Sequence, residues 1–278
     1  MSQPMSDPEL DLEEIEDLLV TEDDEPVDNM FSAKQQRLLV ESLYTAWTPP
    51  PREDDEDEEG EALSAEGPRK FLADANVGVF FSVHEQPMVP DMFLSMDVEL
   101  KSEWIARQHR SYFIWRFGKA PDVVVEIVSN RKGGEMQSKR KRYAQIGVQY
   151  YIVFDPFGIL KGDPLYVYEV GFGKRFRRRE DYSLPGVGLS LTLWEGRYEE
   201  WEKVWLRWLD AGGNLIPTAK EFADAAKHEA DNAVHRADEA AHRADEAEQL
   251  AVREAEARRR AEAEATQLRE ELERLRQQ

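Results

Sequence analysis

The stretch PDVVVEIVSNRKGGEMQSKRKRYAQIGVQYYIVFDP, residues 121–156, constrains the fold more than any other part of the chain. VVVEIV and QYYIVFD are short runs of β-branched and aromatic residues, which are typical of buried strands, and a segment with helical spacing lies between them. Glu126 interrupts the first of these runs. A carboxylate in a buried strand requires a partner, so this residue directs the search for a functional site.

The strand around Glu126 places its acidic residues on one face. Alternate residues of a strand share a face, so Asp122 and Glu126 point the same way. Four residues at about 3.3 Å separate them by roughly 13 Å, which is too far for both to hold one metal ion. The segment MVPDMFLSM supplies Asp91, and adjacent strands lie only about 4.8 Å apart. Asp91 and Glu126 could therefore chelate a hard cation such as Mg²⁺, which proteins usually hold with one or two carboxylates.

The segment that follows the strand predicts a helix whose inner face carries a lysine. At 100° per residue from Met136, Lys139 and Tyr143 fall on the face that meets the sheet, whereas Lys141 falls toward solvent. Two interpretations remain open at this point. Lys139 and Glu126 form an internal ion pair with a purely structural role, or they belong to the site of a metal-dependent phosphodiesterase.

The flanking elements complete an α/β pattern. SAKQQRLLVESLYTAW predicts a helix over about 34–47 that ends at TPPP. NVGVFFSV and PMVPDMFLSM predict two strands joined as a hairpin, and LYVYEV, LSLTLWEG and KVWLRWLD predict further strands. The resulting order of helix, strand, strand, strand, helix and strand, followed by a β-rich tail, predicts a mixed sheet.

The net charge of −21 is concentrated in two tracts. Residues 1–28 hold twelve Asp and Glu without a Lys or Arg, and residues 52–66 hold nine against Arg52, so together they leave the rest of the 278-residue chain near −1. We interpret residues 1–30 as a disordered acidic N-terminus and residues 49–70 as a flexible acidic insertion within a domain over 31–216. The chain has no cysteine, no targeting segment and no apolar run near 20 residues, which favours a cytoplasmic protein without a membrane span.

Residues 217–278 predict one long helix with a heptad seam. Alanines from Ala223 to Ala251 alternate spacings of three and four, and the register continues through Glu254 and Arg258 to the C-terminal leucines. From Ala223 onward the helix would extend roughly 84 Å at 1.5 Å per residue. The seam predicts a coiled coil and a homo-oligomer, weakest along its alanines because alanine buries little surface. The alternative is a solvated single helix with charge pairs four residues apart.

The strand PDVVVEIVS, the segment VPDMFLSMDVEL, the lysine helix and GVQYYIVFDP together resemble the Uma-type family of restriction-endonuclease-like proteins in the PD-(D/E)XK nuclease superfamily. The resemblance covers roughly residues 34–216, apart from the acidic insertion. It implies a restriction-endonuclease-like αβββαβ core with extra strands. It also implies that Asp91 and Glu126 are the metal ligands.

The resemblance assigns further roles and shows one departure. The superfamily lysine normally follows the acid by two residues, where this chain has Val128, so the resemblance implies that Lys139 on the helix replaces it. Lys139 then matches the family's spacing to Tyr143, an accessory residue. Glu41 on the first helix and Asp122 at the strand's edge are further accessory candidates, Asp122 binding a second ion or bracing its loop.

The implied activity is metal-dependent cleavage of DNA. Asp91 and Glu126 would hold Mg²⁺ or Mn²⁺, and Lys139 would orient the attacking water and offset developing charge. Two basic runs, within 131–142 and in GKRFRRRED, are candidates for contact with a nucleic-acid backbone or are simply solvated faces. The alternative function is a non-catalytic binding or scaffold protein that keeps the nuclease fold and acts through its C-terminal coiled coil.

Overall fold

The computed structural model describes residues 29–51, 69–82, 84–98, 111–129 and 135–276. Residues 1–28 of the predicted acidic N-terminus lie outside these ranges, as do most of the acidic insertion and Arg131 and Lys132 of the first basic run. Met30, the last residue of that predicted segment, begins the first helix. The chain divides into two compact units, residues 1–219 and residues 220–278, which are considered separately. Within the described ranges, no helix is both long and apolar enough to cross a membrane.

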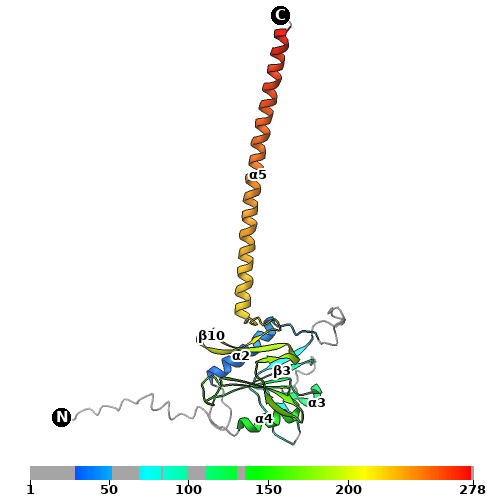
Figure 1. Cartoon of the computed structure of the whole chain (residues 1–278), viewed down its shortest axis with the longest axis vertical. Helices are drawn as coiled ribbons and strands as arrows, with labels where there is room; N and C mark the ends of the chain where they lie inside the picture. Colours follow the sequence, from blue (N-terminus) through cyan, green and yellow to red (C-terminus); the bar gives the residue numbers. More distant parts are fainter. Residues whose placement is uncertain (1–28, 52–68, 83, 99–110, 130–134, 277–278) are drawn as a thin grey trace, which may run out of the picture. The chain divides into compact units, whose positions relative to one another are not determined.

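Figure 1 shows the elements of the chain, coloured along the sequence. The helices and the 3₁₀ helix of the first unit are α2 (Met30–Ala46), α3 (Ile114–Phe117), α4 (Glu135–Ile146) and η4 (Pro185–Val187). Its strands are β1 (Phe71–Asp74), β2 (Val79–Phe80), β3 (Met92–Met96), β4 (Tyr112–Phe113), β5 (Val123–Ile127), β6 (Tyr150–Phe154), β7 (Leu165–Gly171), β8 (Arg175–Arg178), β9 (Ser183–Leu184), β10 (Leu189–Tyr198) and β11 (Trp201–Leu209).

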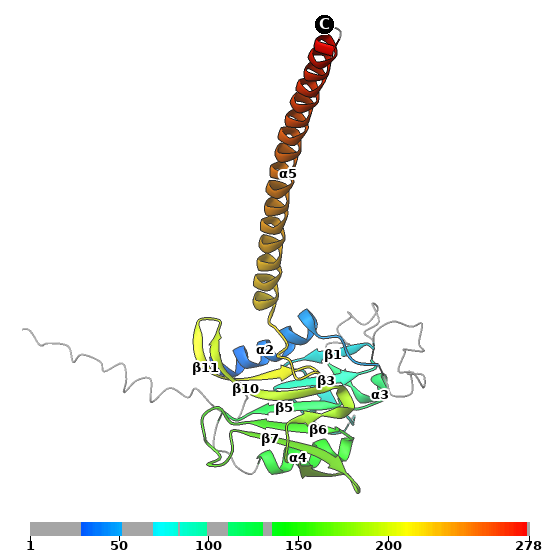
Figure 2. The same cartoon turned by 45° about the horizontal axis from the view of Figure 1, so that its top comes forward.

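A six-stranded mixed sheet is the centre of the first unit. Its strand order is β1-β3-β5-β6-β7-β8, and Figure 2 shows the first five of these side by side. Only β5 and β6 run parallel, and α4 connects them. Along the chain, α2, β1, β3, β5, α4 and β6 occur in that order, and β2, β4 and α3, which are not part of this sheet, lie between them. The mixed α/β sheet that the sequence predicted is present, but β1 takes the place of the predicted strand NVGVFFSV in it.

The sheet separates two hydrophobic clusters. On one face, α2 and the β9–β10–β11 sheet pack against the side chains of Val123, Val125 and Ile127. On the other face, Val124 and Val128 pack with Tyr143 of α4. Because β5 is covered on both faces, its sequence is almost continuously apolar, and Glu126 stands out against it.

The prediction that NVGVFFSV and PMVPDMFLSM pair as a hairpin is wrong. β3 pairs with β1, a strand that the sequence analysis did not identify, and β2 pairs in parallel with β4 in a separate two-stranded sheet. A single bridge between Val79 and Met88 is what remains of the expected hairpin. Pro87 and Pro90 flank this bridge, and neither has an amide hydrogen with which to extend the ladder.

The second unit consists of α5 (Ala219–Arg276), whose first residue belongs to the first unit. It is one continuous helix of 58 residues, and all of its described side chains are exposed. The long C-terminal helix is therefore present as predicted.

Candidate functional site

Glu126 is held at the centre of the six-stranded sheet. It lies on β5, which pairs with β3 on one side and β6 on the other, and only 8 % of its surface is exposed. Strand alternation turns its carboxylate toward the α4 face, the same face as Val124 and Val128. The carboxylate therefore meets side chains from α4.

Two side chains of α4 bind the Glu126 carboxylate. Lys139 Nζ lies 3.0 Å from Oε2, and the Tyr143 hydroxyl donates a hydrogen bond of 2.9 Å to Oε1. The two residues are four apart, which places them one above the other on the same helical face. Burial raises the pKa of Tyr143 well above its usual value, and the charge of Glu126 and the hydrogen bond to it raise this pKa further. Tyr143 is therefore a protonated donor at neutral pH.

Asp91 lies across the sheet from Glu126. Met92 of β3 is paired with Val125 of β5, and Asp91 directly precedes Met92, so Asp91 lies beside the part of β5 that carries Glu126. The Ile127 amide donates a hydrogen bond of 2.5 Å to Asp91 Oδ2, which fixes the Asp91 carboxylate beside β5.

Gln36 of α2 is a residue of this site that the sequence analysis missed. Its Nε2 donates to Asp91 Oδ1 over 3.2 Å, and its Oε1 accepts a hydrogen bond of 3.0 Å from Asn76 Nδ2. Gln36 is buried on the inner face of α2. A signal was available, because Gln36 precedes Leu39 by three residues and Leu43 by seven, which places a polar side chain on the predicted apolar face.

Glu41 does not join this group. Its carboxylate accepts hydrogen bonds from the Tyr198 hydroxyl at 3.2 Å and from the Ala219 amide at 2.9 Å. Glu41 follows Gln36 by five residues, which places it about 140° around the helix from the side chain that reaches Asp91. It anchors the first residue of α5 instead.

Asp122 directly precedes β5 and braces the start of this strand. Its Oδ2 accepts a hydrogen bond of 2.7 Å from the Met96 amide, and it forms an ion pair with Lys119 at 2.7 Å. These contacts tie the start of β5 to the end of β3. Of the two roles considered for Asp122, the structure gives it contacts that suit bracing.

The donor set of the site suits a hard divalent cation. Asp91, just before β3, and Glu126 of β5 offer carboxylate oxygens, and each such oxygen can accept a second interaction besides its present one. Mg²⁺ commonly uses one or two carboxylates and completes its shell with water and substrate phosphate. Among the residues that the structure describes, no group of three or more His, Cys, Asp or Glu could hold a metal ion, so an ion here would rest on two carboxylates.

The cluster is open to solvent on the lysine side. The Lys139 side chain is 29 % exposed, whereas the Glu126 side chain is 10 % exposed. Asp91 is half-buried. The arrangement is therefore not a sealed internal ion pair.

A row of aromatic rings runs from the site to a basic surface. Tyr143 packs on Tyr151 with ring centroids 5.6 Å apart, and Tyr151 lies 6.1 Å from Tyr168. The Arg140 guanidinium stacks over Tyr168 at 5.1 Å, and the Arg178 guanidinium lies 4.7 Å from the neighbouring ring of Tyr166.

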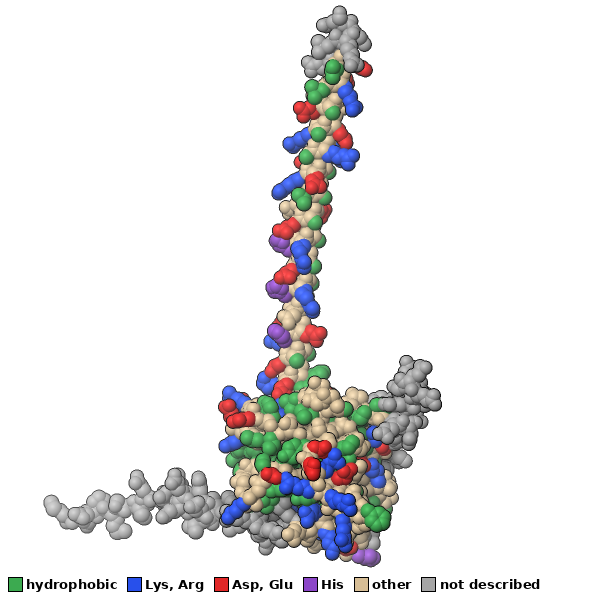
Figure 3. All heavy atoms as spheres, in the orientation of Figure 1, with side chains coloured by type: hydrophobic (Ala, Val, Ile, Leu, Met, Phe, Trp, Pro, Cys, Tyr) green, Lys and Arg blue, Asp and Glu red, His purple; other side chains and the backbone are tan. Residues whose placement is uncertain are grey.

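This row joins the two basic runs of the sequence. Arg140 comes from α4 and Arg178 from β8, two elements in mutual contact. Figure 3 shows Lys and Arg side chains on the end of the first unit where α4 lies. Lys141 is exposed on the same helix, as its helical phase predicted.

Comparison with known proteins confirms the family resemblance. Residues 59–192 match the model of the Uma2 family, described as "Putative restriction endonuclease". This range contains Asp91, Glu126, Lys139 and Tyr143 but not Gln36. No curated protein gives a significant match to the chain.

Among the solved structures that match, one is similar to part of the chain as follows. It is a crystal structure of a "putative nuclease belonging to DUF820" from Anabaena variabilis, with 14 % sequence identity and a TM-score of 0.33. The similarity covers 57 % of this chain and 72 % of that chain.

Proposed function

We propose that this Uma2-family domain is a metal-dependent endonuclease that hydrolyses phosphodiester bonds of DNA. The observation that carries the proposal is the convergence of Asp91, which directly precedes β3, with Glu126 of β5 and Lys139 of α4. The family description supports nuclease chemistry at the coarser level. Two carboxylates and a lysine at a solvent-accessible site are the groups that such hydrolysis needs.

Asp91 and Glu126 would hold Mg²⁺ or Mn²⁺. When bound, such an ion polarises a phosphoryl oxygen and lowers the pKa of a coordinated water. Gln36 and the Ile127 amide fix the Asp91 carboxylate, and the Tyr143 hydroxyl fixes that of Glu126. These contacts hold the ligands in place before the metal binds.

Lys139 places a positively charged side chain at the site. Its ammonium contacts Glu126 Oε2 and remains partly exposed, so it can turn one of its three donors toward a phosphate oxygen. Such a contact offsets negative charge that develops at the phosphate during hydrolysis. Val128, at the position where the superfamily lysine is normally found, is buried and apolar.

The substrate's backbone would follow the basic surface beside α4. Arg140 and Arg178 present guanidinium groups stacked on tyrosine rings, on the sheet face that also carries Glu126. Guanidinium groups bind phosphates in bidentate fashion, and stacking restricts their motion before binding. The net charge of −21 does not oppose this, because the acidic residues concentrate in two separate tracts.

The test is cleavage of supercoiled plasmid by the full chain with Mg²⁺, with Mn²⁺ or with EDTA. We expect nicking that requires the metal and that falls about 100-fold or more in Glu126→Gln and in Lys139→Met. Asp122→Asn serves as the matched control, because Asp122 directly precedes the same strand but braces its start. Nicking that persists in Glu126→Gln at the level of the parent chain would refute the proposal.

A second candidate follows from the contacts of Glu126. Both of its oxygens already bind partners within the protein, so the cluster could serve as a structural ion pair in a non-catalytic binding protein that acts through α5. In that case no plasmid is nicked under any metal condition. Glu126→Gln would then lower only the thermal midpoint of unfolding.

A further inference from the structure

The helix α5 exposes large apolar side chains in an ordered pattern. Those with more than half of their surface exposed are Phe222, Val234, Leu250, Val252, Leu268 and Leu272. In the heptad register that begins with Ala223 at position a, Leu268 and Leu272 occupy d and a. Phe222 and Leu250 occupy g, and Val234 occupies e, so all but Val252 lie in or beside the seam.

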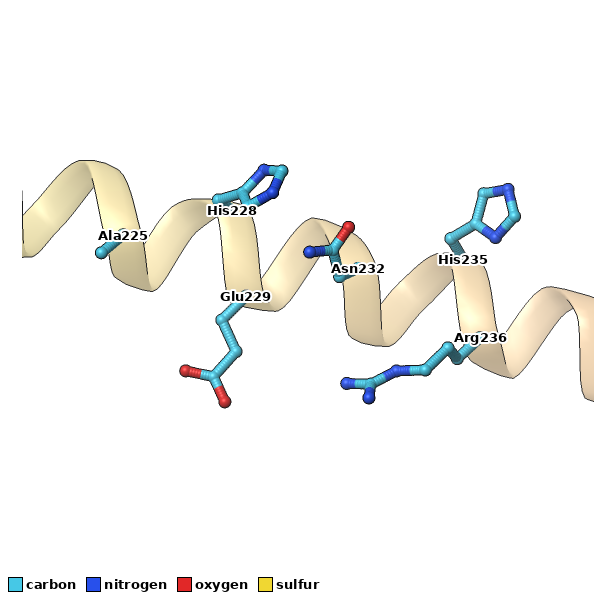
Figure 4. Close-up of a pocket in the computed structure, with 6 residues that line it drawn as sticks. All are labelled: Ala225, His228, Glu229, Asn232, His235 and Arg236. Atoms are coloured by element: carbon cyan, nitrogen blue, oxygen red, sulfur yellow. The ribbon is translucent and has the colours of Figure 1, made fainter.

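The opposite side of the helix is polar. His228, like the histidines one and two heptads later, occupies position f, which faces away from the seam. Figure 4 shows His228 and His235 projecting from one side of α5, while Glu229 and Arg236 project from the other. All residues that line the shallow depression here come from a single helix.

The seam carries two charges in the part that the structure describes. Every a and d position from Ala223 to Ala265 is alanine except Glu254 at d and Arg258 at a. Charged residues in a seam cost stability unless they are paired, and they therefore select the register and direction of the partner helix.

We propose that α5 pairs with α5 of a second copy of the chain as an antiparallel two-stranded coiled coil centred between Glu254 and Arg258. In an antiparallel pair, a positions face d positions of the partner. This register sets Glu254 against Arg258 of the partner subunit, and Arg258 against Glu254 of the partner subunit. Both seam charges are then neutralised by their symmetry mates.

The same register matches large residues with small ones. Leu268 faces Ala244 of the partner subunit, and Leu272 faces Ala240 of the partner subunit. A layer that pairs a large side chain with a small one fills the space between the two helices. A layer of two alanines fills this space less well. The remaining layers between them pair alanine with alanine, and such layers let the two helices approach closely.

A parallel, in-register pair would place the seam charges badly. Glu254 would face Glu254 of the partner subunit and Arg258 would face Arg258 of the partner subunit, and both contacts are repulsive. Opposite charges therefore favour the antiparallel direction over the parallel one. The inference concerns α5 alone and does not depend on nuclease activity.

The absence of cysteine from the chain allows a direct test of direction. The Ala244→Cys and Leu268→Cys chains carry tags of different size. Each is expressed alone, the two are also co-expressed, and every preparation is oxidised mildly. We expect a disulfide-linked heterodimer from the co-expressed pair and no disulfide-linked dimer from either variant alone. Efficient linkage of Leu268→Cys to itself would overturn the proposal in favour of a parallel pair.

A second measurement tests the seam charges. The unmodified chain should have twice its monomer mass of 32.2 kDa by light scattering. Glu254→Arg and Arg258→Glu should each weaken the dimer at least about 10-fold in Kd, since each removes two opposite-charge contacts, and the double swap should restore it. A Glu256→Arg control, at an f position, should dimerise normally. A monomeric parent chain, or single swaps without effect, would overturn the proposal.

Discussion

Two neighbouring tyrosines differ in what their hydroxyls contact. The Tyr143 hydroxyl donates to Glu126, whereas the buried hydroxyl of Tyr151 has no hydrogen-bond partner within the described part of the chain. Burial raises the pKa of Tyr151 as well, and the charge of Glu126 adds to this. Removal of the Tyr143 hydroxyl should therefore weaken the site, whereas removal of the Tyr151 hydroxyl should leave the site unchanged and should not destabilise the fold.

Tyr143→Phe should weaken the site without disrupting the core. The ring remains, but Glu126 Oε1 loses its donor, and loss of such an outer partner typically lowers metal affinity by about 10- to 100-fold. We expect the Mg²⁺ concentration for half-maximal nicking to rise by that factor. Titration of nicking against Mg²⁺ measures it, and an unchanged midpoint would show that the hydroxyl does not position the carboxylate.

Tyr151→Phe is the matched variant. A buried hydroxyl without a partner costs roughly 1–3 kcal/mol, so its removal should leave the free energy of unfolding unchanged or raise it by about 1 kcal/mol. Urea denaturation gives this value, and the Mg²⁺ midpoint should not move. A loss of stability in Tyr151→Phe would reveal a partner for the hydroxyl.

At the scale of elements, the β10–β11 hairpin has an unusual turn. Tyr198 pairs with Trp201, so Glu199 and Glu200 form a two-residue turn, and both have positive φ, 41° and 69°. Hairpins of this length favour Asn and Gly at these positions. The Glu199 carboxylate binds Lys34 at 2.6 Å and Arg37 at 2.7 Å, which ties the hairpin to α2.

Glu200→Gly should stabilise the hairpin. Glycine relieves the left-handed backbone strain of about 1–2 kcal/mol, which exceeds its added entropy cost of about 0.5–1 kcal/mol. The Arg197–Glu200 contact that is lost is highly exposed and contributes little. Urea denaturation should show a gain of about 0.5–1 kcal/mol. Glu200→Ala should show none, and equal gains in both variants would contradict the strain argument.

The tie between the hairpin and α2 should depend on pH. Hydrogen bonds from Arg37 and then Lys34 lower the pKa of Glu199 from 4.5 to about 2. The stabilisation of the fold by the ionised Glu199 carboxylate is therefore complete above about pH 4.5 and is lost as the pH falls toward 2. Glu199→Gln should melt below the parent chain at pH 6, and the difference should vanish near pH 2. A difference that persists at pH 2 would assign the effect to something other than charge.

The sequence predicted the elements around Glu126 well because they are local and periodic. β5, β3 and the phase of α4 that turns Lys139 inward all follow from patterns of apolar residues within short segments. The pairing of β1 with β3 could not be predicted, because β1 has only four residues and its partner is chosen by the rest of the sheet. The Glu199–Glu200 turn was missed for the opposite reason, since its residues carry no turn signal.

The site was predicted in part. Asp91, Glu126, Lys139 and Tyr143 are brought together, but Glu41 is not, and Gln36 takes its place on α2. Helical phase decides between Gln36 and Glu41 only once the face that meets Asp91 is known, and this depends on how α2 packs. A sequence pattern without that packing cannot make the choice.

At the scale of the whole molecule, charge is separated along the chain. The two acidic tracts account for almost all of the net charge, while arginines of α4 and β8 share one surface of the first unit. Local field rather than net charge determines whether a polyanion binds to such a surface.

Binding of DNA should depend on salt in proportion to the arginines that contact phosphate. Arg140→Gln and Arg178→Gln should each reduce the slope of log Kd against log salt concentration by about 1. Lys203→Gln, an exposed change on β11 in the other sheet, should leave the slope unchanged. Fluorescence anisotropy in Ca²⁺, which replaces Mg²⁺ to prevent cleavage, gives the slopes, and equal slopes in all variants would exclude this surface.

The separation along the chain of the groups that meet at Glu126 has a consequence for the order of folding. Lys139 and Tyr143 follow Glu126 by 13 and 17 residues, whereas Asp91 precedes its Ile127 contact by 36. Shorter loops close at a lower cost in entropy, so the β5–α4 contacts can form early. Asp91 arrives only with the register of β3, and a slip of one residue would turn it to the opposite face. Folding in this order would bring the neutralising ammonium to Glu126 before the second negative charge comes near.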